Sequence, residues 1–213
     1  QITQGTQKAI INWADFSINE GELTEFFQPN AQSVVLNRVT GGNPSAIFGA
    51  LRGNGNVFVI NPNGILVGAN GSINVNGLVL STLDVKNGEF LAGGDQIFKG
   101  DSDSGNVTNM GRINAIGGDV FLLGRTVTNS GSIKGKGTVG LAAGEEILLS
   151  ATGGAEGERL FVRATGAGAS GVGVLNDGSI EGAAVELKAH GNMYALAINN
   201  KGCLLYTSPS PRD

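Results

Sequence analysis

The sequence predicts an all-β fold: a right-handed single-stranded parallel β-helix with an N-terminal β cap and extra-helical hairpins. The main observation is a glycine-centred phrase, Asn-x-Gly-x-Ile, that recurs along the chain in complete or partial form. From glycine to glycine its copies are 40, 20, 47 and 24 residues apart. These steps are one or two multiples of the roughly 20 to 24 residues expected for one coil of a solenoid. The glycines are Gly71, Gly111, Gly131, Gly178 and Gly202.

The residues around each glycine fit strands and turns rather than helices. Asn and Gly tolerate positive φ and let the backbone reverse direction at low steric cost. Apolar residues alternate with polar ones, as in Ile73 and Val75 or Val185 and Leu187, which is the period of a strand. A coil of this length has room for three short strands, and its asparagines form turns or stacked amide ladders. The repeat-turn residues are Asn109, Gly111, Asn129, Gly131, Asn176 and Gly178.

The composition is that of a folded chain with little charge. The 213 residues are 40% hydrophobic and 15% charged, include 36 glycines and carry a net charge of −4. This balance argues against an intrinsically disordered chain, and the scattered basic residues give no footprint for nucleic acid or an anionic membrane. No run approaches about 18 apolar residues, so we expect no membrane-spanning segment.

The pattern divides the chain into parts. Residues 1–40 lack the repeat phrase, and we expect them to form an N-terminal β cap over the open apolar end of the solenoid. Residues 41–202 are expected to form the β-helix itself. Two interruptions, at about 85–107 and 151–175, indicate hairpins or loops that leave the coil on one face. Such excursions are the expected places for variable recognition.

The last eleven residues break the repeat abruptly. The segment 203–213 resembles the translation of a sequencing-library adapter, and we therefore expect it to be a processing scar outside the fold. It contains Cys203, the only cysteine, so the rest of the chain is expected to hold no disulfide and no thiolate site.

A short motif follows the apolar run that ends at Ile60. It consists of Asn61, Pro62, Asn63, Gly64 and Ile65. Proline presets φ, the Asn-Gly pair favours a tight turn, and the first Asn side chain can bond nearby backbone amides. By itself the motif predicts a tight turn. Two roles stay open at this stage: a β-helix corner that only shapes the fold, and a direct contact with a partner.

In its context the motif carries a resemblance to a known family. The order of segments from Lys8 to Leu83 resembles the secretion domain of two-partner-secretion (TPS) exoproteins, also called the haemagglutination activity domain, and the similarity extends over nearly all of residues 1–202. This family includes filamentous haemagglutinin-like and high-molecular-weight adhesins. A second motif found in some members, Asn-Pro-Asn-Leu, is absent. The segments that carry the resemblance are 9–13, 16–18, 36–39, 55–65 and 80–83.

The resemblance implies a β-helical domain at the N-terminus of a long exported protein. It implies recognition in the periplasm by the POTRA domains of an outer-membrane TpsB-type transporter, followed by release to the medium or cell surface. The signal peptide that such a route requires is not in this fragment. Asn61 to Ile65 match the motif that the family needs for efficient secretion. Residues of the expected cap are candidates for transporter recognition: Trp13, Phe16, Asn37 and Arg38.

Two other function classes remain as alternatives. The domain could itself be adhesive, binding a host-cell glycan or protein through its excursions. It could also be a polysaccharide-active β-helix enzyme, which needs acids clustered on one face of successive coils. The acids are sparse and the single His190 has no evident catalytic partner in the sequence, so we expect no catalytic residues, no cofactor and no metal site.

Overall fold

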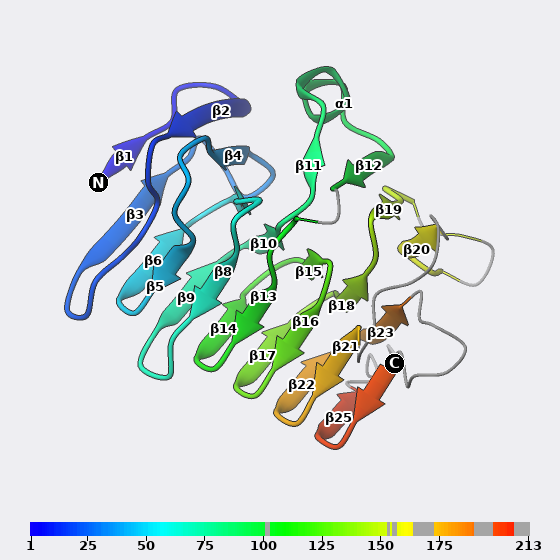
Figure 1. The fold of residues 1–213 in the computed structure, drawn as a ribbon. Coiled ribbons are helices and arrows are strands. Elements are labelled where there is room, and N and C mark those ends of the chain that lie inside the picture. The colour runs from blue at the N-terminus through cyan, green and yellow to red at the C-terminus, as the bar shows by residue number, and fades with distance from the viewer. Residues whose placement is uncertain (101–102, 153, 155–156, 164–172, 190–197, 207–213) are drawn as a thin grey trace, which may run out of the picture.

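The computed structural model describes residues 1–213 except 101–102, 153, 155–156, 164–172, 190–197 and 207–213. Three parallel sheets wind around one axis, and each complete turn of the chain adds one strand to each sheet (Figure 1). This is the parallel β-helix that the sequence predicts. The N-terminal strands lie at one end of the stack and β25 lies at the other.

Complete coils give one strand to each sheet, whereas the first coil gives no strand to the third sheet and the last described strand, β25, belongs to the first sheet. The first sheet contains β1 (Ile2–Thr3), β3 (Leu23–Phe27), β6 (Ala50–Gly53), β9 (Ser72–Val75), β14 (Arg112–Ala115), β17 (Ser132–Gly135), β22 (Ser179–Gly182) and β25 (Cys203–Tyr206). The second contains β2 (Lys8–Trp13), β4 (Val34–Val39), β7 (Asn56–Ile60), β10 (Gly77–Ser81), β15 (Val120–Gly124), β18 (Thr138–Ala143) and β23 (Ala184–Ala189). The third contains β5 (Ser45–Ile47), β8 (Ile65–Val67), β13 (Val107–Asn109), β16 (Val127–Asn129), β21 (Val174–Asn176) and β24 (Ile198–Asn200).

The strand register explains the uneven spacing of the repeat. Ile73 pairs directly with Ile113, and Ile133 pairs directly with Ile180. The steps of 40 and 47 residues are therefore single coils that contain an excursion, and the interpretation of such steps as two coils was wrong. The physical reason is that only residues within the stack pair with the neighbouring coils. Residues that leave the stack therefore lengthen a coil without adding a layer.

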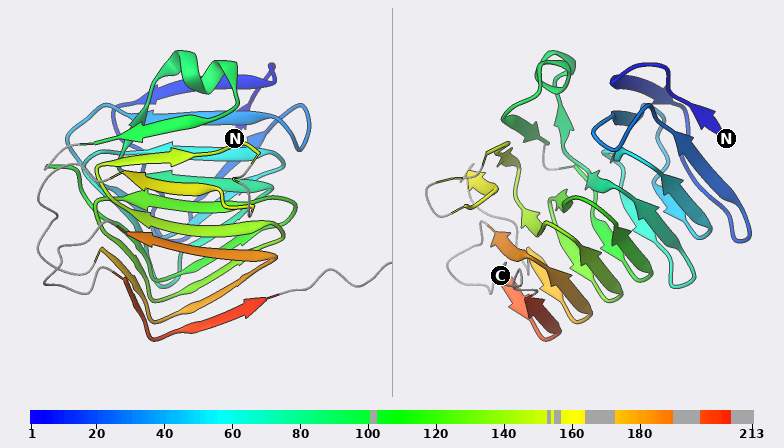
Figure 2. Two further views of the ribbon diagram at one scale, coloured as in Figure 1. Left: turned by 90° about the vertical axis from the view of Figure 1, so that its right-hand side faces the viewer. Right: turned by 180° about the vertical axis from the view of Figure 1, so that it is seen from behind.

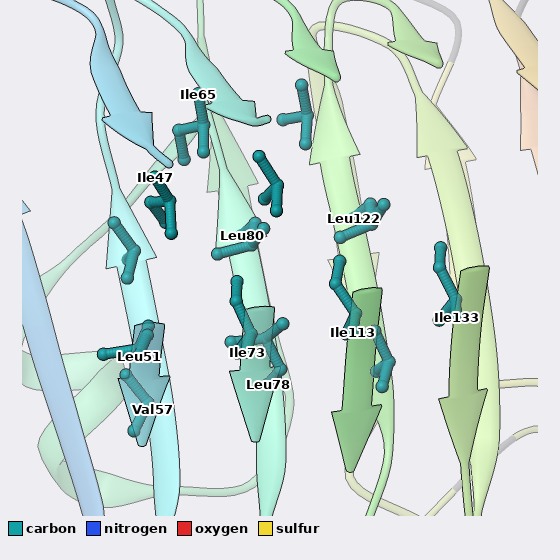
Figure 3. Packing of buried hydrophobic residues seen from close by; sticks show 14 of the residues in the cluster. Ile47, Leu51, Val57, Ile65, Ile73, Leu78, Leu80, Ile113, Leu122 and Ile133 are labelled. Carbon is teal, nitrogen blue, oxygen red and sulfur yellow. The ribbon is translucent and has the colours of Figure 1, made fainter. Parts of the chain in front are cut away.

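The core is a set of apolar columns that run along the axis inside the three sheets. In the first sheet the column is Leu51, Ile73, Ile113, Ile133 and Ile180, each at most 1% exposed, and Figure 3 labels the first four. Burial of one such side chain contributes about 1.5–3 kcal/mol. Because no single coil can enclose these residues, each coil depends on its neighbours for stability.

The two excursions join into one lateral sheet. It is antiparallel and consists of β11 (Asp84–Val85), β12 (Gln96–Lys99), β19 (Glu146–Leu149) and β20 (Leu160–Arg163), with helix α1 (Asn87–Ala92) between the first two strands (Figures 1 and 2). The sequence predicted separate hairpins or loops and no helix, and it placed the start of the second excursion at residue 151 rather than at β19.

A second apolar cluster explains why the excursions pair with each other. The outer face of the second sheet carries Leu36, Phe58 and Val79, which would be exposed on a bare solenoid. The inner face of the lateral sheet places Phe98 and Leu160, both fully buried, in the same cluster. Neither excursion alone covers the outer face of the second sheet, and both therefore pack against it.

The N-terminal segment differs from the expected cap. Strands β2 and β4 pair in parallel with each other and then with β7, so the second sheet runs without a break past residue 40. Segment 16–18 forms a single bridge, Ile18 with Ile47, instead of a strand. Strands β2 and β4 have the length and alternation of the later strands, and for that reason they pair with their neighbours as ordinary coils do. The first coil covers the core with half-buried Ile2, Ala9, Ile11 and Trp13.

The C-terminal segment also differs from expectation. Cys203–Tyr206 forms β25 and pairs in parallel with β22, so the stack continues past residue 202. An open coil end offers unpaired backbone groups, and an extended segment that follows directly can satisfy them whatever its origin. Residues 207–213 lie outside the described residues, and an adapter origin for 203–213 stays a prediction.

Candidate functional site

The Asn61–Ile65 motif is a corner between β7 and β8. Asn61 is fully buried, and its Nδ2 donates to the Asn43 carbonyl at 2.9 Å and to Ser45 Oγ at 3.0 Å. Its Oδ1 accepts from the Asn63 backbone N–H at 3.0 Å, which closes the local turn. Both polar atoms of this side chain are therefore used inside the fold, and one of them ties the corner to the preceding coil.

The remaining residues of the corner have separate roles. Gly64 has φ of +128°, a backbone conformation that residues with a side chain rarely adopt. Its N–H donates to the Asn61 carbonyl at 3.1 Å, so the turn is closed by the backbone as well. Pro62 and Asn63 are the exposed members, and the Asn63 amide donates to the Gly41 carbonyl at 2.8 Å.

Neighbouring coils hold the corner on both sides. The Ser45 N–H donates to the Gly64 carbonyl at 2.9 Å, and the Gly105 N–H donates to the Pro62 carbonyl at 2.7 Å. A Cβ on Gly105 would lie 2.6 Å from the Asn63 carbonyl carbon, so only glycine allows this approach. The corner is thus one layer of a stack of corners.

The predicted cap residues lie close together near the start of the solenoid. The Trp13 indole N–H donates to Asn37 Oδ1 at 3.0 Å, and the Asn37 amide donates to the Phe58 carbonyl at 3.1 Å. Trp13 also packs edge-to-face on Phe16, with ring centroids 5.6 Å apart. Phe16 and Asn37 are buried, whereas Trp13 is half-buried. Of this trio, only Trp13 presents substantial surface.

Arg38 has a different position. Its guanidinium bonds to Asp84 Oδ1 at 2.9 Å, to Asn87 Oδ1 at 2.5 Å and to the Val85 carbonyl at 2.6 Å. The side chain is 14% exposed, and all three partners belong to the first excursion or its start. Arg38 therefore fastens the lateral sheet to the second coil.

Lys8 makes a similar contact that the sequence did not indicate. Its ammonium group donates to the carbonyls of Phe90 and Leu91, at 3.1 and 2.8 Å, in the last turn of α1. A cation at this end of a helix satisfies carbonyls that have no partner within the helix. The two residues are more than 80 positions apart, so no local pattern could reveal the contact.

The repeat asparagines form an amide ladder inside the solenoid. Asn109 donates to Asn129, Asn129 to Asn176 and Asn176 to Asn200, each from Nδ2 to Oδ1, at 2.8, 2.7 and 2.8 Å. The first three are fully buried. The glycines that follow approach the previous coil closely, because a Cβ on Gly178 would lie 2.0 Å from the Gly131 carbonyl oxygen. This identifies the repeat phrase as a structural element.

The outer face of the lateral sheet has a row of alternating charges. Glu146 lies between Lys99, at 2.8 Å, and Arg163, at 3.1 Å, on the two flanking strands. Hydrogen bonds from Lys99 and then from Arg163 hold the pKa of the Glu146 carboxyl below its ordinary value of 4.5. The described residues contain no group of three or more His, Cys, Asp or Glu placed to hold a metal ion. His190 lies outside the described residues.

Comparison with known proteins assigns this geometry to a family. The model of the TPS secretion domain matches residues 1–206. The chain belongs to the TPS secretion domain family. Its members are secretion domains of adhesin-like exoproteins rather than an enzyme class, which indicates export by the two-partner pathway. Within the described part of the chain, no helix is both long and apolar enough to cross a membrane.

Solved structures of other secretion domains resemble this chain. The chain is 32% identical to the HMW1 secretion domain from Haemophilus influenzae, with a TM-score of 0.68, over 86% of this chain and 53% of that one. The filamentous hemagglutinin secretion domain, 16% identical, shares the fold with a TM-score of 0.57 over 92% of this chain and 89% of that one.

Curated relatives match a shorter stretch. A heme/hemopexin-binding protein of Haemophilus influenzae is 45% identical over 85 residues, which is 40% of this chain and 9% of that protein. The same protein from the strain ATCC 51907 / DSM 11121 / KW20 / Rd is 46% identical over 85 residues. The matched region spans about 9% of the length of these relatives.

Proposed function

We propose that this TPS secretion domain directs a longer exoprotein to its TpsB-type outer-membrane transporter, whose POTRA domains bind it in the periplasm. Family membership over residues 1–206 is the observation that carries the proposal. The same domain then starts the folding of the β-helix outside the cell, because each new coil can stack on the coil before it.

The first strand of the second sheet is the proposed contact. β2 is the outermost strand of that sheet and pairs on one side only, with β4. An outermost strand presents backbone donors and acceptors to which a partner can add a strand of its own. Trp13, at the end of β2, adds half-buried aromatic surface beside that edge.

The Asn61 corner has a shaping role in this proposal. Its side chain is buried and bonded within the fold, so a partner of the folded domain can reach only Pro62 and Asn63. Loss of Asn61 would open the layer that connects β7 to β8, and recognition would fail as a consequence of incorrect folding.

Binding of purified periplasmic domains of the transporter to this chain tests the proposal. Removal of residues 1–13 is expected to abolish binding, because it deletes β1 and β2. Asn61→Ala is expected to weaken binding and folding stability together, whereas the matched surface variant Pro62→Ala changes neither. Full binding without residues 1–13, or loss of binding in a stably folded Pro62→Ala variant, would contradict this assignment of the contact.

Direct adhesion is a second candidate, supported by the outer face of the lateral sheet. Ile97, Leu148 and Phe161 lie side by side across three strands, and Ile97 and Phe161 are each 37% exposed. An exposed apolar row of this kind suits contact with a host protein or glycan. Binding of the purified domain to host cells and to a glycan array, lowered by Phe161→Ser, supports adhesion; no binding by the unchanged domain refutes it.

A further inference from the structure

A cleft lies between the second sheet and the lateral structure formed by α1, β12 and β19. Its volume is about 310 Å³. This is at the lower end of the roughly 300–1,000 Å³ typical of small-molecule sites. Its floor is a row of neighbouring positions, Asn56, Gly77 and Asp119. Gly77 contributes no side chain to this row, and the Asn56 amide covers its position, since a Cβ on Gly77 would lie 2.4 Å from Asn56 Oδ1.

The walls of the cleft are aromatic. Phe58 and Phe121 project from β7 and β15, with Val79 between them in register. Phe90 from α1 faces them and packs edge-to-face on Phe58, with ring centroids 5.6 Å apart. Leu149 from β19 completes the apolar lining. A flat ring fits such walls, because aromatic pairs favour edge-to-face or offset stacking.

One polar atom in the lining has no bonding partner. Gln96 Oε1 is buried and accepts no hydrogen bond from any described residue. Gln96 lies on β12, and alternation along that strand turns it toward the same side as buried Phe98. A buried acceptor without a donor is uncommon, since leaving it unpaired is costly. A ligand with an N–H or O–H group would satisfy it.

Among the described residues that line the cleft, two are cations, Lys8 and Arg159, and one is a carboxylate, Asp119. Lys8 Nζ is held by the carbonyls of Phe90 and Leu91. Arg159 stacks over the Phe121 ring at 5.6 Å and bonds to Asp119 Oδ2 at 3.0 Å. The charged lining therefore has a net positive charge, which favours an anionic ligand.

We propose that this cleft binds a small aromatic acid whose ring carries an N–H or O–H donor. The ring lies among Phe58, Phe90 and Phe121, its donor bonds to Gln96 Oε1, and its carboxylate faces Lys8 or Arg159. The site shares Lys8, the first residue of β2, with the strand proposed to contact the transporter, but its other contacts lie away from the backbone edge of β2 and from the Asn61 corner.

Titration with indole-3-acetate, followed by calorimetry and by chemical shifts of cleft residues, tests the proposal. Two changes remove the same hydrogen bond: the 1-methyl analogue lacks the donor, and Gln96→Leu lacks the acceptor. Each is expected to weaken binding about five- to tenfold. Their combination is expected to be no worse than either alone, because the bond can be lost only once.

Two controls separate binding from folding. Gln96→Leu removes a buried unpaired oxygen, so its melting temperature is expected to equal or exceed that of the unchanged domain. Gln32→Leu, at an exposed position outside the cleft, is expected to bind as the unchanged domain does. Absence of saturable binding of indole-3-acetate would overturn the proposal. Equal affinity of the unchanged domain for indole-3-acetate and its 1-methyl analogue would overturn it too. Shifts of cleft residues caused by the transporter's periplasmic domains, with none from indole acids, would overturn it as well.

Discussion

Replacement of Asn129 by alanine removes the central rung of the buried amide ladder. Asn129 donates to Asn176 at 2.7 Å and accepts from Asn109 at 2.8 Å, and it is fully buried. Asn129→Ala leaves one buried donor and one buried acceptor unpaired, at about 1–3 kcal/mol each. We therefore expect the free energy of unfolding to fall by about 4 kcal/mol.

The end of the same ladder provides a matched control. Asn200 accepts one bond, from Asn176 at 2.8 Å, and is exposed. Asn200→Ala leaves only one group without its partner, the Asn176 amide, so it is expected to cost about 1–3 kcal/mol, roughly half as much as Asn129→Ala. Asn129→Asp keeps the acceptor but loses the donor and buries a carboxylate, so it should destabilise at least as much as Asn129→Ala.

Urea denaturation of the unchanged domain and the three variants at neutral pH measures these differences. Similar losses for Asn129→Ala and Asn200→Ala would refute the reasoning, because position in the ladder would then not matter. A loss below about 1 kcal/mol for Asn129→Ala would show that the buried amides are satisfied without the ladder.

Three other predictions concern single positions. Ile113→Ala leaves a cavity in the core column and is expected to lower the free energy of unfolding by about 2–5 kcal/mol in urea denaturation; unchanged stability contradicts the packing. Gly64→Ala places a side chain at φ of +128° and is expected to cost about 1–3 kcal/mol, measured as a lower melting temperature. The Glu146 carboxyl stabilises the fold above its ordinary pKa of 4.5, and this contribution is lost as pH falls through its lower folded pKa. Glu146→Gln should therefore show a smaller loss of stability on acidification than the unchanged domain; identical pH profiles contradict this.

Periodic features of the fold could be predicted from the sequence because they repeat. Alternation around Ile73 and Ile113 predicts the strands and their inward faces, and the Asn-x-Gly phrase predicts turns or an amide ladder, of which the structure shows the ladder. The number of coils could not be derived from spacing, since a step of 40 residues can be two coils or one coil with an excursion. Only the register distinguishes these cases.

Lateral contacts were beyond sequence reasoning because they join segments far apart in the chain. Lys8 bonds to the end of α1, and Arg38 bonds to Asp84 and Asn87, with no local pattern that marks either contact. The motif at Asn61 was found from sequence, and the family resemblance predicts a role for it in secretion. Its burial could not be found in that way, since an asparagine at a turn can bond inward or face solvent equally well.

Export of this chain through its transporter tests the central claim most directly. The chain, preceded by a cleavable signal peptide, would be expressed in a Gram-negative host with and without the cognate transporter. We expect the chain in the medium only when the transporter is present, and less of it for Asn61→Ala. Periplasmic retention despite a working transporter, or equal release without one, would contradict the assignment of a secretion domain that the transporter recognises.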